Sequence, residues 1–422
     1  MRVLMFGWEF PPNISGGLGT ACYGIAKSLN EHGNKIIFVM PKASGNEDKT
    51  YAKIISADQV DVLNTSQEYQ DVYQRLNLIT INSTILPYIS SMEYLSQKLK
   101  VENIITDKWS QRYKFVGAYG SSLMEDVANY VQVARQVALD YKDEYDVIHA
   151  HDWLTFNAGI VAKYISGKPL VVHVHATDFD RGGDGTSDVF RIELDGMTHA
   201  DKIVAVSQLT KNILIEKYGQ PASKIEVVHN GLVRANIKSK RADKNIDGKI
   251  VTFLGRVTQQ KGPTYFVDVA KKIIESVPDV HFVMAGNGDM MPIIIRMVAA
   301  SGLSHRFHFT GFLAGGEVNR MLEMSSVYVM PSVSEPFGIS PLEAINSSVP
   351  VIISKQSGVS EVLNHALKFD YWDLDDLADK IVAVLKYPVL SDTLVKEGQK
   401  EVADLTWDKV ANKLECIYKS II

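Results

Sequence analysis

The segment VYVMPSVSEPFGISPLEA, residues 327–344, runs from a strand through a loop into a helix. Its first four residues are all apolar and include two valines and a tyrosine, which predicts a short buried strand. Ser340 and Pro341 are residue types favoured at the N-cap and at the first position of a helix, so a helix is predicted to begin there. A strand that leads through a loop into a helix is the repeating unit of a parallel α/β sheet.

The same alternation extends in both directions along the chain. Segments with helical periodicity, such as Thr20–Asn30, separate short apolar runs. Buried strands are predicted at residues 3–6, 35–40, 146–150, 170–175, 202–206, 224–229, 249–254, 280–285, 307–310 and 349–353. Strands of this kind indicate parallel sheets that helices cover on both faces. The expected fold class is therefore α/β, with two Rossmann-like doubly wound domains facing a central cleft.

A polar stretch at Leu232–Gly248 interrupts this alternation and is a candidate linker between two domains. We expect a first domain over residues 1–235 and a second over residues 236–406. Residues 62–130 are less regular, and we interpret them as an insertion in the first domain that contains several helices. The segment Trp407–Ile422 has an apolar stripe with helical spacing and is predicted to be a helix.

The composition is that of an ordinary globular protein, with 46% hydrophobic and 22% charged residues in a chain of 422. A formal net charge of -5 gives no general attraction to phosphate backbones, so no nucleic-acid partner is expected. The two cysteines are too few for a disulfide framework and suit a reducing compartment. No uncharged apolar stretch reaches the roughly 18 residues of a membrane span. These features predict a soluble, cytoplasmic protein without an integral membrane segment.

Two glycine-containing loops follow predicted strands. Gly16–Gly19 precedes a helix whose first N–H groups could face an anion, although a turn that needs positive φ would also explain these glycines. Arg256 and Lys261 lie in the loop after the strand 249–254, where they could hold one diphosphate from two sides. The alternative for this pair is two solvated loop cations.

The loop of the opening segment carries two carboxylates, Glu335 and Glu343, on either side of Gly338 and Ile339. Backbone N–H groups of that turn could bind negative oxygens, and a carboxylate can accept hydrogen bonds from pairs of sugar or ribose hydroxyls. Two structural alternatives compete with this interpretation. Ser340 and Glu343 have the spacing of a capping box, and Glu335 could be an ordinary loop acid.

Histidines gather at the ends of two predicted strands, in HAHDW at residues 149–153 and in HVH at residues 173–175. Because side chains alternate along a strand, the two histidines of each motif share a face. We expect the first histidine of each motif to be a core residue, and the second, His151 or His175, to lie nearer the cleft. No cysteine is near, so no metal site is predicted. The Asp-x-Asp pattern at residues 178–180 is interpreted as loop structure.

Together these motifs resemble the retaining group 1 glycosyltransferases of GT-B fold. The glycine loop and the HAHDW motif resemble the glycogen and starch synthase branch in particular. The resemblance covers nearly the whole chain, and its most specific part is the segment 335–344. It implies a nucleotide-diphosphate sugar as donor, with Arg256 and Lys261 on the diphosphate. It also implies that the helix 407–422 packs back onto the first domain.

The resemblance assigns roles to individual residues. The implied catalytic residues are His175, Glu335, Arg256 and Lys261, with His175 beside the anomeric centre and Glu335 on the transferred sugar. The implied donor-binding residues are Gly17, Arg256, Lys261, Gly286, Gly311, Glu335, Phe337, Gly338, Ile339 and Glu343, with Glu343 on the ribose. The acceptor-side candidates are His151, Asp152 and Trp153.

The implied reaction moves a hexose, expected to be glucose, from UDP-glucose or ADP-glucose to a glucan or oligosaccharide with retention at the anomeric carbon. Two cations and a helix N-terminus would neutralise the leaving diphosphate, so no metal or other cofactor is expected. Two alternatives stay open. One is a transferase of the same fold that acts on a lipid or small-molecule acceptor, and the other is a nucleotide-sugar epimerase or a non-catalytic binder.

Overall fold

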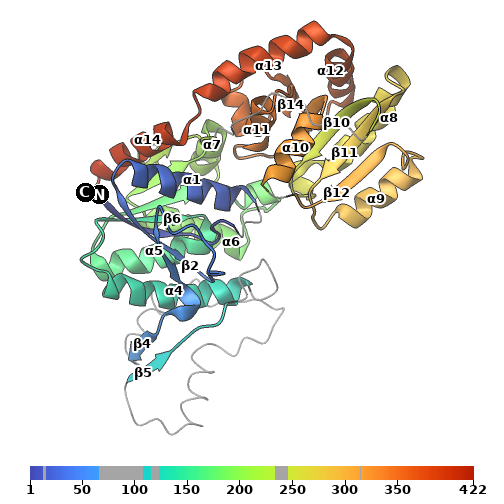
Figure 1. The fold of residues 1–422 in the computed structure, drawn as a ribbon. Helices are drawn as coiled ribbons and strands as arrows, with labels where there is room; N and C mark the ends of the chain where they lie inside the picture. The colour runs from blue at the N-terminus through green and yellow to red at the C-terminus, as the bar shows by residue number, and fades with distance from the viewer. Residues whose placement is uncertain (13–15, 66–107, 116–122, 233–245, 314) are drawn as a thin grey trace.

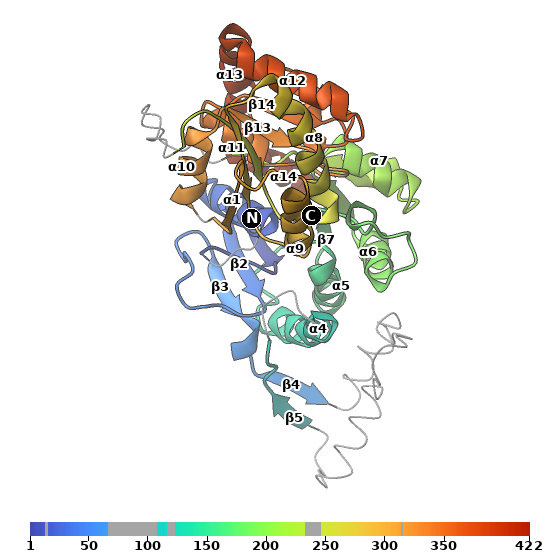
Figure 2. The same ribbon diagram turned by 90° about the vertical axis from the view of Figure 1, so that its right-hand side faces the viewer.

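The computed structural model describes residues 1–12, 16–65, 108–115, 123–232, 246–313 and 315–422. The described chain forms two lobes, each built around its own parallel sheet (Figure 1). An antiparallel pair, β4 (Val62–Thr65) and β5 (Lys108–Gln111), lies at the end of the first lobe that faces away from the second (Figure 2). None of the helices in the described ranges is long and apolar enough to cross a bilayer.

The first sheet has seven strands in the order β3-β2-β1-β6-β7-β8-β9, and every pairing is parallel. These strands are β1 (Arg2–Phe6), β2 (Lys35–Met40), β3 (Lys53–Ser56), β6 (Val147–His151), β7 (Leu170–Val174), β8 (Lys202–Ala205) and β9 (Ile225–Val227). The central strands are almost wholly buried, because helices cover both faces of the sheet.

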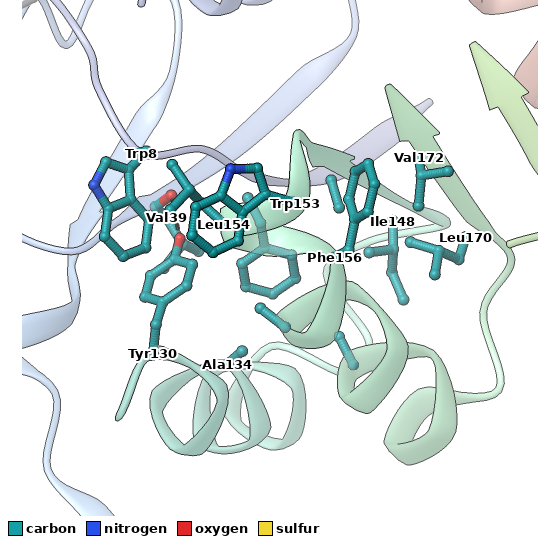
Figure 3. Close-up of a cluster of buried hydrophobic side chains, with 14 of the residues drawn as sticks. Trp8, Val39, Tyr130, Ala134, Ile148, Trp153, Leu154, Phe156, Leu170 and Val172 are labelled. Carbon is teal, nitrogen blue, oxygen red and sulfur yellow. Dashed lines mark hydrogen bonds between the residues drawn. The ribbon is translucent and has the colours of Figure 1, made fainter. Parts of the chain in front are cut away.

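The helices of the first lobe divide between the two faces. One face is covered by α4 (Leu123–Asp140), α5 (Trp153–Ser166) and α6 (Asp188–His199). Figure 3 shows the core on that face, where Phe156 of α5 lies beside Ile148 of the sheet and Trp153 lies on the side of Trp8 and Tyr130. The other face is covered by α1 (Gly17–Glu31) and α14 (Trp407–Lys419), and α7 (Gln208–Glu216) follows β8.

The helix α14 joins the first lobe although it follows the second lobe in the sequence (Figure 1). It packs against α1, and the Trp407 ring lies so close to Gly24 that a Cβ at that glycine would come within 2.2 Å of the indole. The chain therefore crosses between the lobes twice. The two crossings touch where the Leu232 N–H donates to the Leu405 carbonyl at 2.9 Å.

The second sheet has six parallel strands in the order β12-β11-β10-β13-β14-β15. Its strands are β10 (Lys249–Leu254), β11 (Val280–Ala285), β12 (Phe307–Gly311), β13 (Val327–Met330), β14 (Val351–Ser354) and β15 (Leu367–Phe369). Its helices are α8 (Pro263–Ser276), α9 (Met291–Ala300), α10 (Gly316–Met324), α11 (Ser340–Asn346), α12 (Leu374–Lys386) and α13 (Pro388–Ala403). This is the strand order of a doubly wound sheet, and it reverses between β10 and β13.

Every strand predicted from the sequence is present, and the α/β architecture of two doubly wound domains is confirmed. The strands β3 and β15 were not predicted, because both are short edge strands with lysines and only partial burial. In the insertion at 62–130, the described residues form β4, β5 and the start of α4, so strands occur where only helices were predicted. The rest of that prediction, and residues 233–245 of the predicted linker, lie outside the described residues.

Candidate functional site

Most of the predicted donor-binding residues gather where β10 and β13 end. Ligands of doubly wound sheets bind outside the carboxyl ends of the strands, at the point where the strand order reverses. The loop 255–262 leaves β10 at this point, and the loop 331–339 leaves β13. The two loops touch, because the Val333 N–H donates to the Gln260 carbonyl at 2.9 Å. The fold thus joins two motifs that are far apart in the sequence.

Glycines allow close backbone contacts around this point. Gly262 has a left-handed φ of +66°, and a Cβ there would lie 2.0 Å from the Pro331 carbonyl oxygen. Gly286 has a φ of +132°, and its Cβ would lie 1.9 Å from the Gly255 carbonyl oxygen. Both positions therefore need glycine for backbone packing. Gly311, at the end of β12, is also left-handed but has open space around it.

Lys261 and Glu335 form an ion pair across the two loops. Glu335 is only 7% exposed, and its backbone is fixed because its carbonyl accepts the Gly358 N–H at 2.9 Å. A buried carboxylate is costly unless it is paired, so Lys261 stabilises it. The Arg256 side chain is exposed and has no hydrogen-bond or ion-pair partner in the part of the chain that the structure describes. It is thus available to an anionic ligand.

The turn between the two glutamates is held firmly by its neighbours. Phe337 is buried in the second lobe, and its carbonyl accepts the Val359 N–H at 2.7 Å. Gly338 has a φ of +99°, a conformation that side chains other than glycine rarely adopt. Ile339 comes next and is the N-cap of α11. The predicted anion-binding turn is therefore a rigid element that leads directly into a helix N-terminus.

The structure corrects the prediction for the start of α11. Ile339 is the N-cap and Ser340 is already the first helical residue, so the capping-box alternative for Glu343 is wrong. The Ser340 hydroxyl instead shares a hydrogen bond of 2.7 Å with the Tyr328 hydroxyl. The Glu343 carboxylate has no hydrogen-bond or ion-pair partner among the described residues, and burial raises its pKa. It is a half-buried acceptor that lacks a donor.

In the first lobe, the helix α1 begins directly at Gly17. This is earlier than the predicted start at Thr20, so the glycines form the first helical turn itself. Gly16 and Gly17 are exposed, and no side chain of the described residues caps the helix. The first N–H groups of α1 are therefore open to a ligand oxygen.

Four imidazoles cluster at the carboxyl ends of β6 and β7. His149, His151 and His173 are fully buried, and His175 is half-buried. The Nδ1 atom of His151 lies 3.0 Å from the Nε2 atom of His175, so these rings share a hydrogen bond. Burial lowers the pKa of all four imidazoles, which are therefore neutral near pH 7. The predicted core positions of His149 and His173 are confirmed.

The three acceptor-side candidates have buried side chains. The Asp152 carboxylate accepts the His175 N–H at 2.6 Å and the Ala176 N–H at 3.3 Å. The Trp153 ring packs in the hydrophobic core of the first lobe (Figure 3), and His151, predicted to lie nearer the cleft than His149, is 0% exposed. Asp152 and His151 bond directly to His175, and Trp153 packs in the core, so none of the three side chains lies on an exposed surface.

His149, His151 and His173 each place a ring nitrogen within 4.8 Å of the other two. The ring planes of His149 and His173 differ by only 3°, and those of His151 and His173 by 28°. A metal ion lies close to the plane of each imidazole that binds it, and nearly parallel stacked rings do not aim their lone pairs at one point. As arranged, this cluster does not offer a metal centre.

The Asp-x-Asp pattern is loop structure, as predicted. One oxygen of Asp180 accepts the Thr177 N–H at 2.7 Å and its hydroxyl at 2.8 Å. The other oxygen accepts the Ser334 hydroxyl at 2.5 Å, which ties the first lobe to the residue before Glu335. Asp178 accepts the Ser187 hydroxyl at 2.7 Å. Nothing in the sequence spacing pointed to the link between the lobes, because its partners are far apart along the chain.

A second link between the lobes was also missed. The Glu361 carboxylate accepts the N–H groups of Gln208 and Leu209 at 2.8 and 2.7 Å, at the first turn of α7. The His229 ring lies 3.1 Å from the same carboxylate. A carboxylate at a helix N-terminus is favourable, so Glu361 of the second lobe stabilises a helix of the first.

A cavity of about 570 Å³ lies beside Gly311, between the end of β12 and α10. Its walls are mainly apolar, with one acid and one base among them. The lining residues are Thr310, Leu313, Gly316, Glu317, Arg320, Met321 and Met324. Gly311, which follows the lining residue Thr310 in the chain, is among the residues that the resemblance assigns to the donor.

Two family descriptions match the chain in succession. Residues 110–234 match Glycosyltransferase Family 4, and residues 235–401 match Glycosyl transferases group 1. The chain belongs to the group 1 glycosyltransferases. The sequence motifs of this glycosyltransferase had suggested the same family, and the match confirms it.

Relatives of this glycosyltransferase extend over nearly its whole length. An uncharacterized glycosyltransferase of Methanocaldococcus jannaschii is 26% identical, covering 99% of this chain and 98% of its own. A glycogen synthase of Mycobacterium tuberculosis is 22% identical, covering 99% and 94%. Sucrose-phosphate synthase from Thermosynechococcus elongatus has a TM-score of 0.74 at 17% identity, covering 99% and 98%. Anabaena HepE, solved with UDP and glucose, has a TM-score of 0.68 at 18% identity, covering 100% of both chains. These structures confirm the GT-B fold.

Proposed function

We propose that this glycosyltransferase moves a hexose, expected to be glucose, from a nucleotide-diphosphate sugar to a glucan or oligosaccharide acceptor. The observation that carries the proposal is the arrangement at the switch point of the second sheet. There, the Lys261–Glu335 ion pair, the exposed Arg256 and the unpaired carboxylate of Glu343 surround one rigid turn. Cations for a diphosphate and acceptors for hydroxyls are the groups that a sugar nucleotide needs.

The leaving diphosphate sets the main demand on catalysis. Its developing charge would be stabilised by Arg256, by Lys261 and by the N–H groups at Gly338 and Ile339, and such preorganised donors are usually the largest catalytic contribution. Glu335, once Lys261 turns toward the phosphate, would accept hydrogen bonds from the sugar. We propose that no metal or other cofactor is required, because these groups supply the positive charge.

Retention of the anomeric configuration is proposed from the carboxylates on the opposite side. One oxygen of Asp152 accepts two backbone N–H groups and the other lies 3.8 Å from the Arg181 guanidinium, while Asp180 accepts hydrogen bonds from Thr177 and Ser334. Neither is free to attack the anomeric carbon. In the proposed front-side reaction, the bond from that carbon to the phosphate oxygen breaks, the acceptor hydroxyl oxygen bonds to the carbon, and its proton passes to the departing phosphate.

The sugar and acceptor classes are proposed from the relatives. The glycogen synthase of M. tuberculosis aligns over almost the entire chain, and HepE was solved with UDP and glucose. Both support a glucosyl donor, and the first supports a glucan acceptor. The nucleotide base and the acceptor length are the parts of the proposal that only an assay can decide.

The test is a donor panel of UDP-, ADP- and GDP-glucose, each with and without glycogen and maltooligosaccharides. We expect release of nucleoside diphosphate that depends on the glucan, and a product whose new linkage is α by NMR. A β linkage would refute retention. Release that requires a lipid-linked or small-molecule acceptor would move the protein to the second class of acceptor. Isomerised donor without transfer would identify an epimerase.

A further inference from the structure

The histidine cluster connects the helix α14 to His175. At one end, the Tyr418 hydroxyl of α14 lies 2.6 Å from Nδ1 of His149. At the other end, Nδ1 of His151 lies 3.0 Å from Nε2 of His175. Between these hydrogen bonds, the rings of His149 and His151 lie 4.3 Å apart with a tilt of 31°. The path runs entirely through the interior as far as His175.

The tautomer of His149 follows from its partner. Tyr418 is 0% exposed, and among the described residues its hydroxyl has only the hydrogen bond to His149. If that hydroxyl accepted a proton from the ring, its own O–H would be left unpaired in a dry interior, which is unfavourable. Tyr418 therefore donates, and Nδ1 of His149 accepts. A neutral imidazole carries one proton, so the proton of His149 is on Nε2.

The tautomer of His151 follows from His149. The Nε2 atoms of both rings are buried without a hydrogen-bond partner in the described chain. A proton on both would place two unpaired N–H dipoles in one apolar cluster. Opposite tautomers leave only one of the two Nε2 atoms with an unpaired N–H, an arrangement that electrostatics favours for rings whose centroids lie 4.3 Å apart. His151 then carries its proton on Nδ1 and donates to Nε2 of His175.

We propose that Tyr418, His149 and His151 are positioning residues that hold His175 as the tautomer protonated on Nδ1. The Nδ1 atom of His175 has no protein partner in the described part of the chain, and the residue is half-buried, so this nitrogen is the one left for a ligand. His175 would then be a hydrogen-bond donor to an oxygen of the bound sugar nucleotide. This role for the donor rests on the proposed function, whereas the tautomer itself does not.

The direct test is NMR of the full chain labelled with ¹⁵N-histidine, without any ligand. Long-range ¹H–¹⁵N correlations show which ring nitrogen carries the proton, and single histidine variants assign the signals. We expect His175 to be protonated on Nδ1, and Tyr418→Phe to shift it toward a mixture of tautomers. Tyr145→Phe is the matched control, because Tyr145 is equally buried but donates to the Ala138 carbonyl, away from the cluster.

Kinetics provide the second readout. Tyr418→Phe should lower kcat by about fivefold, the equivalent of one ordinary hydrogen bond, with little change in the donor KM. His151→Asn retains an amide that can donate near the position of Nδ1 and should keep more activity than His151→Gln. If His151 had a merely structural role, His151→Asn and His151→Gln would both lower the melting temperature, and their activities would not differ in this way.

Three results would overturn the proposal. They are a proton on Nε2 of His175 in the unmodified protein, an unchanged His175 tautomer in Tyr418→Phe, and stoichiometric bound metal that displaces protons from the cluster. Absence of transfer with every donor and acceptor would refute the proposed function alone, because the NMR result stands without turnover.

Discussion

The two lobes share one architecture but differ in how the charged groups at their strand ends are satisfied. In the first lobe, Asp152 accepts two backbone N–H groups, and the buried Glu193 pairs with Arg181 at 3.0 Å. In the second lobe, Arg256 and Glu343 have no protein partner among the described residues. Saturated polar networks rigidify a site, whereas unpaired groups beside a cleft await a ligand. The first lobe therefore supplies a framework whose charged groups are already paired, with His175 and the start of α1 as its open groups, and the second lobe supplies the charged groups that a ligand completes.

The strongest test of this contrast is Glu335→Gln. We expect kcat to fall by about 30- to 150-fold, the equivalent of about 2–3 kcal/mol, because a charged acceptor for the sugar and the partner of Lys261 are both lost. Steady-state kinetics over a range of donor concentrations measure the effect, and Glu275→Gln on the exposed face of α8 is the matched control. Unchanged kcat in a normally folded variant would remove Glu335 from the reaction.

Substitution of Arg256 should affect donor binding alone, whereas substitution of Lys261 should affect both donor binding and stability. Arg256→Ala and Lys261→Ala should each weaken donor binding by about 1.5–3 kcal/mol through loss of a charge-assisted contact. Only Lys261→Ala should also lower the melting temperature, since it leaves Glu335 buried without its counter-ion. Donor titrations and thermal melts of both variants check this. Equal melting temperatures would contradict a stabilising role for the ion pair.

Glu343→Gln should have a smaller effect that is confined to the donor. Loss of a charged acceptor for ribose hydroxyls should raise the donor KM about tenfold, or about 1–2 kcal/mol, with kcat little changed. Since no protein group bonds to this carboxylate in the described chain, the melting temperature should not fall. A KM equal to that of the unmodified enzyme would leave Glu343 without a role in the donor site.

In the first lobe, the buried Glu193 should make the stability of the protein depend on pH. Burial raises the pKa of Glu193 to about 7 from its ordinary 4.5, and this effect outweighs that of Arg181. Between about pH 4.5 and 7, the folded protein keeps a proton on Glu193 that the unfolded chain has already released. The free energy of unfolding therefore falls as the pH rises through this window. Relative to Glu193→Gln, the unmodified protein should lose about 1–3 kcal/mol between pH 5 and 7.5. A constant difference in melting temperature over this range would contradict the prediction.

Removal of metal ions is expected to have no effect on activity. Treatment with EDTA followed by gel filtration should leave the transfer rate unchanged, because Arg256, Lys261 and backbone N–H groups carry the positive charge that a metal would supply. Loss of activity that Mn²⁺ or Mg²⁺ restores would show that these cations are insufficient.

The sequence predicted the elements well and the contacts between them poorly. Apolar runs and their spacing located β13 and the loop after it, because these signals are local. The pairing of Lys261 with Glu335 and of Asp180 with Ser334 depends on which strands become neighbours, and no local pattern encodes that. Alternation along β6 correctly placed two histidines on one face, but it could not show that Tyr418 of α14 would bond to one of them, His149.

The same physical limit explains the error at Ser340. Serine followed by proline and, three residues later, a glutamate has the local signature of a capped helix start. The Ser340 hydroxyl instead bonds to Tyr328 of the adjacent strand, and Ile339 takes the N-cap position. A contact with another element thus overrode a local preference and left Glu343 available.

The return of α14 to the first lobe has a consequence for the order in which the protein matures. During synthesis, β1 and α1 emerge long before Trp407, yet the cover over α1 is complete only when the Trp407 ring reaches Gly24. Until then, the nascent first lobe exposes part of its core, while the residues of the second sheet have already left the ribosome. The lobe that is translated first is therefore completed last, and a chain cut before residue 407 would lack the helix that packs against α1 and bonds to His149.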